Sequence, residues 1–260
     1  MSDILNVISA SDKRRNLLIL LNSGTKEWDE IKRTLHVTST GMLPQVKILE
    51  EEGLIKRDGK LFALTPMGRV LTAHLKPLVR TMEVFDAHKK FWVEHNLDVL
   101  PFDILMDIRS LGNYQIIENS DEEIFDVNIF LKNISPAKTL KGLSHTVHPT
   151  FPEFFLNLAK NGVETSLIFT PSVLKILNEK YPGWVREFLG FSTTSIYMTE
   201  KDFKFSFVVT DSYFSISLFY NTGIFDSKND VASHDASALE WGERIYAFLL
   251  KHSEKIERPD

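Results

Sequence analysis

The sequence predicts two domains of mixed α and β structure, an α+β N-terminal domain and a layered α/β C-terminal domain. Its 260 residues are 43% hydrophobic and 25% charged, which is ordinary for globular proteins and sufficient for two cores. Residues 1–66 read as helices and one tight hairpin, whereas residues 98–260 alternate strand and helix patterns. A helical connector over residues 67–97 is predicted between them.

Composition excludes several classes of function. The chain has no cysteine, which excludes disulfides, iron–sulfur clusters and thiolate zinc sites. No stretch approaches the ~20 apolar residues of a membrane span, and the first residues lack the order of a secretion signal. We therefore expect a cytoplasmic protein without a membrane partner. Residues 1–93 hold 15 Lys or Arg against 11 Asp or Glu, whereas the rest is acidic, which favours an anionic partner for the N-terminal domain alone.

The first two helices are predicted from caps and periodicity. Ser11 precedes an apolar segment over residues 11–21 that the Asn-Ser-Gly sequence at 22–24 ends. Thr25 is predicted to cap a second helix over residues 26–35, whose acidic residues near its start suit the positive end of the helix dipole.

A third helix follows a short turn at residues 36–38. Its apolar side chains Met42, Val46 and Leu49 recur at helical spacing, and Gly53 ends it. Proline in a helix interior costs ~3 kcal/mol but is tolerated in the first turn. Pro44 therefore predicts a start near Thr40-Gly41 or an irregular first turn.

A two-stranded hairpin is predicted next. Asp58-Gly59 is a strong signal for a two-residue turn, since such turns need positive φ that these residues tolerate. Apolar residues on both sides, Leu54-Ile55 and 61–64, give the two strands. A fourth helix begins at Thr65-Pro66, a cap followed by proline at the first helical position.

This order of elements is that of a winged helix-turn-helix, in which the third helix enters the major groove of double-stranded DNA and the hairpin lies on phosphates. Hydroxyl groups and lysines suit phosphates, and glutamine can read adenine. The residues expected to contact DNA are Thr38, Ser39, Thr40, Leu43, Gln45, Lys47, Lys56, Arg57 and Lys60. Winged helices also serve as protein-interaction modules, and that alternative stays open.

The connector over residues 67–97 has an apolar helical period that Pro77 interrupts, so the helix is expected to kink or restart near Lys76. Its apolar face can belong to a core or to a dimer interface. We favour a homodimer, because two-fold operators are read by two-fold proteins.

The C-terminal domain is predicted from alternating patterns. Helices are expected over residues 101–111, 121–131, 151–160, from Pro171 and over 236–251; strands are expected over residues 114–117, 139–143, 163–169, 195–198, 203–209 and 213–220. The last three strands are consecutive and suggest a β-meander. An α/β layered domain results.

Several stretches of this chain are similar to one known family. They are LEEEGLIKRDGKLFALTPMGR, KKFWVEHNLDVLPFDIL, SHTVHPTFPEFFLNLAKNGVETSLIFTPSVL, FSFVVTDSYFSISLFYNTGIFDSKND and SALEWGERIY. The chain resembles, nearly end to end, the archaeal methanogenesis-regulator family of transcription factors, of the filamentation-regulator type. The resemblance implies a DNA-binding transcriptional regulator whose second domain senses an effector.

The resemblance also implies a second domain distantly similar to the phospholipase D fold, whose catalytic motif is His, Lys two residues on and Asp five after that. In the HxK sequence His74-Leu75-Lys76, Thr81 stands where the motif has Asp. No GxSxG, HExxH or phosphate-loop motif is present. We therefore expect no enzyme and no cofactor; a degenerate or unrecognised hydrolase with a winged helix for targeting is the alternative.

The best candidate for an effector site is a set of polar residues that follow predicted strands, where ligands gather in α/β sheets. The set is Ser144, His145, His148, Thr170 and Asp211. His145 and His148 could instead bind a metal with Glu153, but a third ligand is not assured, so no metal is expected. Each of these residues can equally be a turn or cap residue.

Overall fold

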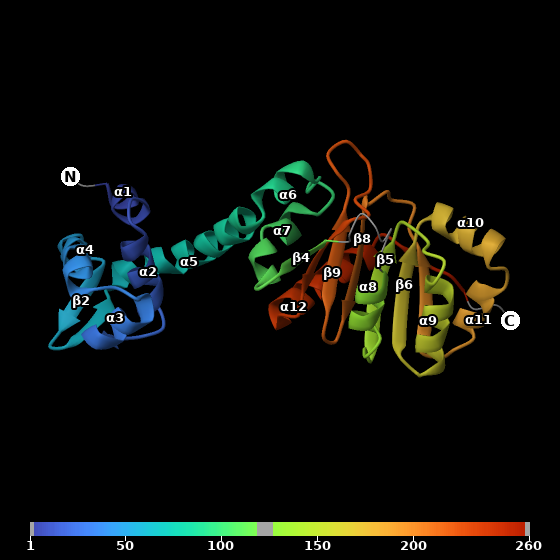
Figure 1. The fold of residues 1–260 in the computed structure, drawn as a ribbon, viewed down its shortest axis with the longest axis horizontal. Helices are drawn as coiled ribbons and strands as arrows, with labels where there is room; N and C mark the ends of the chain where they lie inside the picture. The colour runs from blue at the N-terminus through green and yellow to red at the C-terminus, as the bar shows by residue number, and fades with distance from the viewer. Residues whose placement is uncertain (1–2, 119–126, 258–260) are drawn as a thin grey trace. The chain divides into compact units, whose positions relative to one another are not determined.

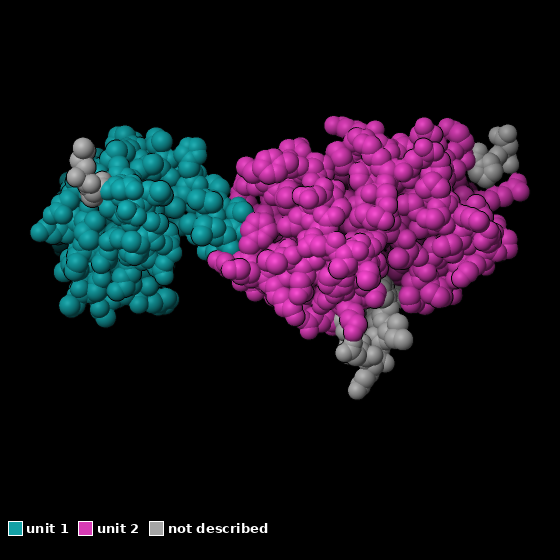
Figure 2. Space-filling model, turned by 90° about the horizontal axis from the view of Figure 1, so that it is seen from above, with its two compact units in different colours: residues 1–83 teal, residues 84–260 magenta. Residues whose placement is uncertain are grey.

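The computed structural model describes residues 3–118 and 127–257 (Figure 1). The chain divides into two compact units, Met1–Glu83 and Val84–Asp260 (Figure 2). This boundary falls inside the segment predicted to be a connector. Among the described residues, no helix combines the length and the apolar character needed to cross a membrane. The mixed α and β fold is confirmed.

Unit 1 consists of helices and one small antiparallel sheet with the strand order β1-β3-β2. Its elements are α1 (Ile4–Ser9), α2 (Asp12–Leu21), β1 (Lys26–Glu27), α3 (Trp28–Leu35), α4 (Ser39–Glu51), β2 (Ile55–Asp58), β3 (Leu61–Leu64) and α5 (Pro66–Ala87), whose last residues belong to unit 2. Apolar side chains of α2, α3, α4 and the hairpin form the core, in which Leu17, Ile31 and Leu49 are fully buried.

Helix caps in unit 1 follow the sequence at two of three predicted positions. Ser11 accepts a hydrogen bond from the amide of Arg14, and Thr65 accepts one from the amide of Gly68 at 3.0 Å, as predicted. Thr25 does not cap α3, and that prediction was wrong. Residues 26–27 instead pair with β3 as strand β1, so that α3 begins only at Trp28.

The start of α4 and the hairpin turn each differ by a residue or two from the predictions. The amide of Met42 donates to the carbonyl of Thr38 at 3.1 Å, so the first turn is regular and the helix starts at Ser39 despite Pro44. In the hairpin, Asp58 pairs with Leu61. The turn is therefore Gly59-Lys60, not Asp58-Gly59, and the positive φ of 59° falls on the glycine, which has no Cβ to strain.

Of the two alternatives predicted for the connector at Pro77, a kink or a restart, the restart does not occur. The connector helix α5 is a single helix from Pro66 to Ala87 with Pro77 inside it. Proline removes one backbone hydrogen bond, and the side chain of Thr81 donates to the Pro77 carbonyl at 3.0 Å. The helical hydrogen bonds on either side of Pro77 are sufficient to continue the helix.

Unit 2 contains an eight-stranded sheet with helices on both faces (Figure 1). Its elements after α5 are α6 (Lys89–Glu94), α7 (Phe102–Leu105), the 3₁₀ helix η1 (Ile108–Leu111), β4 (Gln115–Glu118), α8 (Val127–Ile134), β5 (Thr139–Ser144), α9 (Phe151–Lys160), β6 (Glu164–Phe169), α10 (Pro171–Lys180), α11 (Trp184–Leu189), β7 (Thr194–Met198), β8 (Phe205–Thr210), β9 (Phe214–Leu218), β10 (Asn229–Ser233), α12 (Ala236–Leu250) and β11 (Glu254–Lys255).

The sheet has the strand order β11-β7-β6-β5-β8-β9-β10-β4. Strands β5, β6 and β7 are parallel, and β8 runs antiparallel to β5. The meander predicted for β7, β8 and β9 was wrong, because β7 pairs with β6, and two strands, β6 and β5, separate β7 from β8. The antiparallel meander is β8-β9-β10, and its last strand was not predicted.

Each face of the sheet is covered by its own core. Alternate residues of β8 and β9, such as Phe207 and Ile216, pack with α7 and α12 on one face. On the other face, Leu140, Leu167 and Val208 pack with α9, α10 and α11. Trp241 and Tyr246 on α12 are buried.

The remaining differences concern short elements. Residues predicted as one helix over 101–111 form α7 and η1, and α11 and β11 were not predicted. The helix predicted over 121–131 lies partly outside the described residues, and α8 starts at Val127. Lys204 was expected on a strand but precedes β8, with a positive φ of 49°.

Candidate nucleic-acid interface and candidate effector site

Most of the residues predicted to contact DNA are exposed on α4 and on the β2–β3 hairpin. The exposed members are Thr38, Thr40, Leu43, Lys47, Lys56, Arg57 and Lys60. Leu43 is 50% exposed. The Nζ atom of Lys47 lies 3.7 Å from the Glu51 carboxylate in a solvent-exposed pair. Such pairs contribute little, so Lys47 can exchange Glu51 for another anion.

Arg57 is held in place on the hairpin. Its Nε donates to the carbonyl of Gly59 at 2.9 Å, and its guanidinium lies 5.4 Å from the centre of the Phe62 ring. The remaining guanidinium N–H groups face solvent, since the residue is exposed. This arrangement presents a positioned cation beside the turn.

Three of the predicted residues, Thr38, Ser39 and Gln45, make hydrogen bonds within unit 1. Thr38 accepts a hydrogen bond from the amide of Gly41 as the cap of α4, and Ser39 accepts one from the Trp28 indole at 3.2 Å. Gln45 Oε1 accepts from Arg14 Nη1 at 2.9 Å, which joins α4 to α2. The adenine contact predicted for Gln45 requires this hydrogen bond to break.

One further cation next to α4 was missed. Lys13, on α2, is exposed, and its Nζ lies 3.4 Å from the carbonyl of Gly41 in the first turn of α4. The Asp-Lys-Arg-Arg sequence at 12–15 is visible in the chain. It was interpreted as the start of a buried helix, and only the packing of α2 against α4 brings Lys13 to this surface.

The predicted effector residues of unit 2 do not come together. Ser144 ends β5, whereas Asp211 follows β8, which runs in the opposite direction. Asp211 accepts hydrogen bonds from the amides of Lys138 and Thr139, at 2.8 and 3.3 Å, before β5 begins. Burial pushes the pKa of Asp211 up, but these hydrogen bonds outweigh burial and hold it below its ordinary value. The grouping of Asp211 with Ser144 was wrong, because β8 is antiparallel to β5.

The other predicted residues are turn and cap residues. His148 Nδ1 accepts from the amide of Thr150 in a turn, and Thr170 caps α10. His145 is partly buried, and this burial lowers the pKa of its imidazole, with Asp202 opposing the effect. Within the described ranges no three His, Asp or Glu side chains come close enough together to hold a metal ion.

A cavity of about 80 Å³ lies between the sheet of unit 2 and the helices on one of its faces. Of the five predicted effector residues, Ser144 alone lines it. Its helix side is largely aromatic, with Phe151 and Phe155 of α9 and Trp184 of α11. Of the 21 residues along the cavity wall, all of them in the described part of the chain, Asp230 is the one that has a formal charge.

Polar side chains cross the sheet in a row along the cavity. Ser206 on β8 lies directly opposite Ser217 on β9. Ser217 donates a hydrogen bond to the carboxylate of Asp230 on β10, and Ser144 on β5 is the fourth member lining the cavity. Burial raises the pKa of Asp230, and the negative charge of Asp226 raises it further against the lowering effect of the Ser217 hydrogen bond. We call Ser144, Ser206, Ser217 and Asp230 the polar row.

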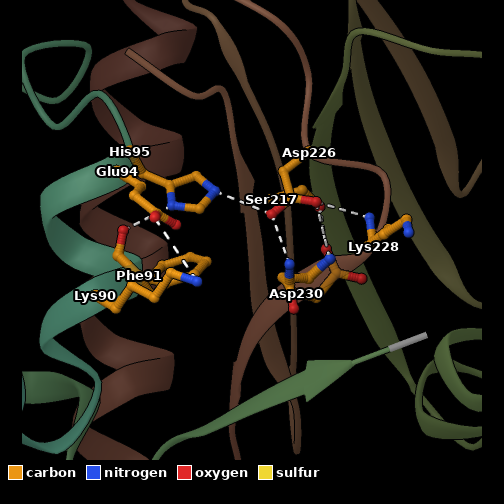
Figure 3. A network of polar contacts seen from close by, with 9 residues as sticks. Lys90, Phe91, Glu94, His95, Ser217, Asp226, Lys228 and Asp230 are labelled. Carbon is orange, nitrogen blue, oxygen red and sulfur yellow. Dashed lines mark hydrogen bonds and ion pairs between the residues drawn. The ribbon is translucent and has the colours of Figure 1, made fainter. Parts of the chain in front are cut away.

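A buried ion pair lies close to the polar row. His95, which follows α6, points toward Asp226 in the β9–β10 connection, while Ser217 and Asp230 lie on the neighbouring strands (Figure 3). His95 Nε2 is 3.0 Å from Asp226 Oδ2, and the two side chains are 1% and 0% exposed. His95 Nδ1 is 2.7 Å from the carbonyl of Phe91. Both neighbouring oxygens can accept a hydrogen bond from the imidazole ring.

Asp226 also holds its own loop. It accepts hydrogen bonds from the amides of Lys228 and Asn229, at 2.8 and 3.2 Å, and from the Asn229 side chain at 2.8 Å. Burial pushes the pKa of Asp226 up, but these hydrogen bonds and those from Tyr220 and His95 hold it below its ordinary value. The Asp226 carboxylate therefore fixes the β9–β10 connection against the end of α6.

Two family models match the chain, one in each unit. The N-terminal domain of the methanogenesis regulatory protein FilR1 matches residues 2–83, and the middle domain of the same protein matches residues 126–252. The chain belongs to this family. The predicted family resemblance is thereby confirmed, and the N-terminal family domain ends at residue 83, where unit 1 ends.

A relative of this family is the methanogenesis regulatory protein FilR1 of Methanothrix harundinacea (strain 6Ac). It is 20% identical over 261 residues, an alignment that covers 98% of this chain and 58% of the relative. The chain therefore spans little more than half the length of that protein.

Two solved structures show distant likeness. TrmBL2, described as an archaeal chromatin protein with a novel mode of DNA binding, is 12% identical, with 94% of this chain and 92% of that chain covered and a TM-score of 0.45. The phosphatidylserine synthase of Haemophilus influenzae Rd KW20 is 12% identical, with 56% and 40% covered and a TM-score of 0.42. Both scores are below 0.5, so neither likeness supports an argument about fold or function.

Of the polar row, sequence reasoning predicted Ser144 and missed the other three members, and it missed the pairing of His95 with Asp226. A signal for the row exists, because Ser206, Ser215 and Ser217 alternate with large apolar residues in FSFVVT and FSISLF. Serine on the buried face of a strand leaves space that a larger side chain would fill. For His95 and Asp226, 131 residues apart, no local pattern exists.

Proposed function

We propose that this chain is a DNA-binding transcriptional regulator whose second unit senses a small-molecule effector. Unit 1 acts as a winged helix: α4 enters the major groove, and the β2–β3 hairpin is the wing. Lys56, Arg57 and Lys60 on the wing neutralise phosphates, and Thr40, Leu43 and Lys47 face the groove. A regulator is favoured over an enzyme because the family is described by its regulatory role.

One observation supports the DNA-binding proposal most strongly. The three wing cations are exposed, and Arg57 is positioned by the hairpin itself through Gly59 and Phe62. Positioned cations next to a helix whose outward face contains hydroxyl, amide and lysine side chains match phosphate contacts beside a base-reading surface. A protein-interaction module has no need for this distribution of charge.

The test is the double variant R57E/K60E. Duplex DNA enriched from a randomised pool on the wild-type protein serves as the probe, and affinity is measured by fluorescence anisotropy across a salt series. The wild type should lose affinity with salt, and the variant should bind at least about tenfold more weakly, with a salt slope smaller by about one for each lost phosphate contact.

A matched control is K175E/K180E, which makes the same change in net charge on the exposed side of α10 in unit 2. It should leave the salt slope nearly unchanged. If both variants lost the same amount of DNA affinity, the effect would come from the net charge of the protein and not from the hairpin. If R57E/K60E bound DNA as tightly as the wild type does, the proposal that the β2–β3 hairpin contacts DNA would be wrong.

The effector response is proposed to start at the cavity. A ligand at Asp230 changes the electrostatic environment of Asp226, which holds the β9–β10 connection against His95. His95 directly follows α6, the helix after α5. An effector acts only if its affinity differs between two arrangements of this connection, so a His95→Gln variant should keep DNA binding and lose the response of DNA affinity to a ligand.

A homodimer is part of the proposal. Helix α5 exposes a set of large apolar side chains within roughly 120° of its circumference, as its 3.6-residue period places them: Met67, Val70, Leu78 and Met82. A second copy can cover this stripe, and two-fold symmetry suits inverted repeats with recognition helices ~34 Å apart. L78K/M82K should sediment as a monomer where the wild type is a dimer; a monomeric wild type bound to single half-sites contradicts this part.

A further inference from the structure

The cavity of unit 2 has an unusual balance of charge. Its walls are apolar and aromatic, and Asp230 is the one charged residue among the described residues that line it. No lysine, arginine or histidine within the described ranges forms an ion pair with Asp230. A carboxylate withdrawn from water without a cation is costly. The site therefore lacks the positive charge that would make Asp230 favourable as an anion.

The hydrogen bonds around Asp230 leave room for a donor. Ser217 donates to Oδ1, and an ionised carboxylate offers about four acceptor positions. Ser206 accepts from the amide of His145 at 3.0 Å, which leaves its own proton to be donated and a further lone pair to accept. The polar row thus offers a concentrated set of acceptors at one end of an otherwise apolar space.

The aromatic walls favour the same kind of ligand. Phe130, Phe151, Phe155 and Trp184 line the helix side, whereas Phe169 lines the cavity from β6 and Phe225 from the β9–β10 connection. Aromatic faces attract cations through their quadrupole and also provide apolar contact. An anionic ligand would meet a carboxylate and no cation. A neutral apolar ligand would leave Asp230 without a counter-charge.

Size restricts the ligand further. A water molecule needs roughly 10–15 Å³ of such volume, so about 80 Å³ accommodates on the order of five to eight non-hydrogen atoms. A nucleotide, a disaccharide or a long acyl chain is too large for this space without rearrangement.

We propose that this cavity binds a compact organic amine in its ammonium form. The ammonium group pairs with Asp230 and donates to the hydroxyl oxygens of Ser217 and Ser206, and the hydrocarbon part lies between the aromatic side chains of α9 and α11. This inference rests on the effector role proposed for unit 2 and adds the chemical class of the effector.

The test compares ligands of one shape and three charges. Benzylamine, benzyl alcohol and benzoate are titrated into the full chain near neutral pH by isothermal calorimetry, together with the pair cyclohexylamine and cyclohexanol. Each amine should bind at least about tenfold more tightly than its alcohol, as expected for a desolvated charge pair. Benzoate should show no binding.

Asp230→Asn tests the assignment to this carboxylate. Asparagine has nearly the same shape and still accepts a hydrogen bond from Ser217, so the variant should stay folded. It should bind the alcohol as the wild type does and no longer bind the amine more tightly than the alcohol. Glu164→Gln, which removes an exposed carboxylate at the start of β6, is the matched control and should keep that preference. If Asp230→Asn does not fold, Ser217→Ala and Phe155→Ala are tested in its place. Both variants should bind the amine more weakly than the wild type does.

Two outcomes overturn the inference: alcohols that bind as tightly as amines, or an amine preference that survives Asp230→Asn. The outcome for the proposed function is separate. If the amine binds but DNA affinity does not change, the proposed ligand class is supported and the sensor role is refuted. If the R57E/K60E variant binds DNA as tightly as the wild type does, the DNA interface is refuted, and the proposal for the cavity is not affected.

Discussion

The two candidate sites differ in how they are placed relative to solvent. In unit 1 the cations of the β2–β3 hairpin are exposed, and none of them is needed to hold the core. In unit 2 the polar row lines a largely apolar cavity, and Asp230 lies close to the buried pair of His95 and Asp226. Exposed charges are stabilised by water whether or not a partner is present, whereas enclosed charges require partners from the protein or from a ligand.

We therefore expect function and stability to be separable in unit 1 and coupled in unit 2. Substituting a wing cation should change binding and little else. Substituting a member of the buried network should change stability and the effector response together. The predictions below test this contrast, beginning with the largest expected effect.

Asp226→Ala should have the largest effect. It leaves the buried imidazole of His95 without its carboxylate, and breaking a buried pair by removing one partner costs roughly 3–5 kcal/mol of unfolding free energy. Urea unfolding measures the total, and hydrogen exchange with mass spectrometry should locate the lost protection in unit 2 while unit 1 keeps its own.

Asp98→Ala is the control, because Asp98 is exposed in the segment that follows the same helix. It should change the unfolding free energy by less than about 0.5 kcal/mol. If Asp226→Ala lowered the unfolding free energy by less than about 1 kcal/mol, or if protection were lost in both units, the difference expected between unit 1 and unit 2 would be wrong.

Gln45→Ala should have a smaller effect, confined to unit 1. It removes the acceptor of Arg14, and a lost hydrogen bond of this kind costs about 1 kcal/mol or somewhat more where the donor is charged. Lys47→Ala, two residues along the same helix and exposed, should cost almost nothing in stability and weaken DNA binding.

The same pair of variants separates the two roles of α4. If Gln45→Ala left stability unchanged and altered the preference between DNA sequences, Gln45 would be a base-reading residue, as its sequence position predicts. If both variants destabilised unit 1 equally, function and stability would not be separable there.

The smallest effect expected is on pH dependence. The hydrogen bond from Arg244, at 2.6 Å, lowers the pKa of Asp107 in unit 2. A carboxyl with a lowered pKa in the folded state stabilises above its ordinary pKa, near 3.8, and the stabilisation is lost as pH falls through the lowered value. Asp107→Asn should therefore lower the unfolding free energy at neutral pH and reduce its fall between neutral pH and the region below pH 3.8.

The unit 1 counterpart is Asp29, whose pKa is lowered by a hydrogen bond from Lys32 on the fully exposed side of α3. Solvent screens that pair. Asp29→Asn should change the pH profile less than Asp107→Asn does, and the reverse order would contradict the difference drawn between the units.

The sequence determined the local elements of both units. Ser11 and Thr65 cap their helices because their hydroxyls meet free amides one turn on, and Gly59 forms the hairpin turn because it tolerates positive φ. The helix over 151–160 and the exposed wing cations were likewise predictable. These features depend on residues within a few positions of one another, which a linear reading contains.

The tertiary structure alone decided which distant residues meet. The two-residue period of a strand fixes which side chains share a face, but it does not fix which strands are neighbours. Because β8 pairs antiparallel with β5, Asp211 lies at the opposite end of the sheet from Ser144, and Ser206 comes beside the cavity instead. The pairing of β9 with β10 then places Asp230 next to Ser217, through contacts that only the assembled core makes favourable.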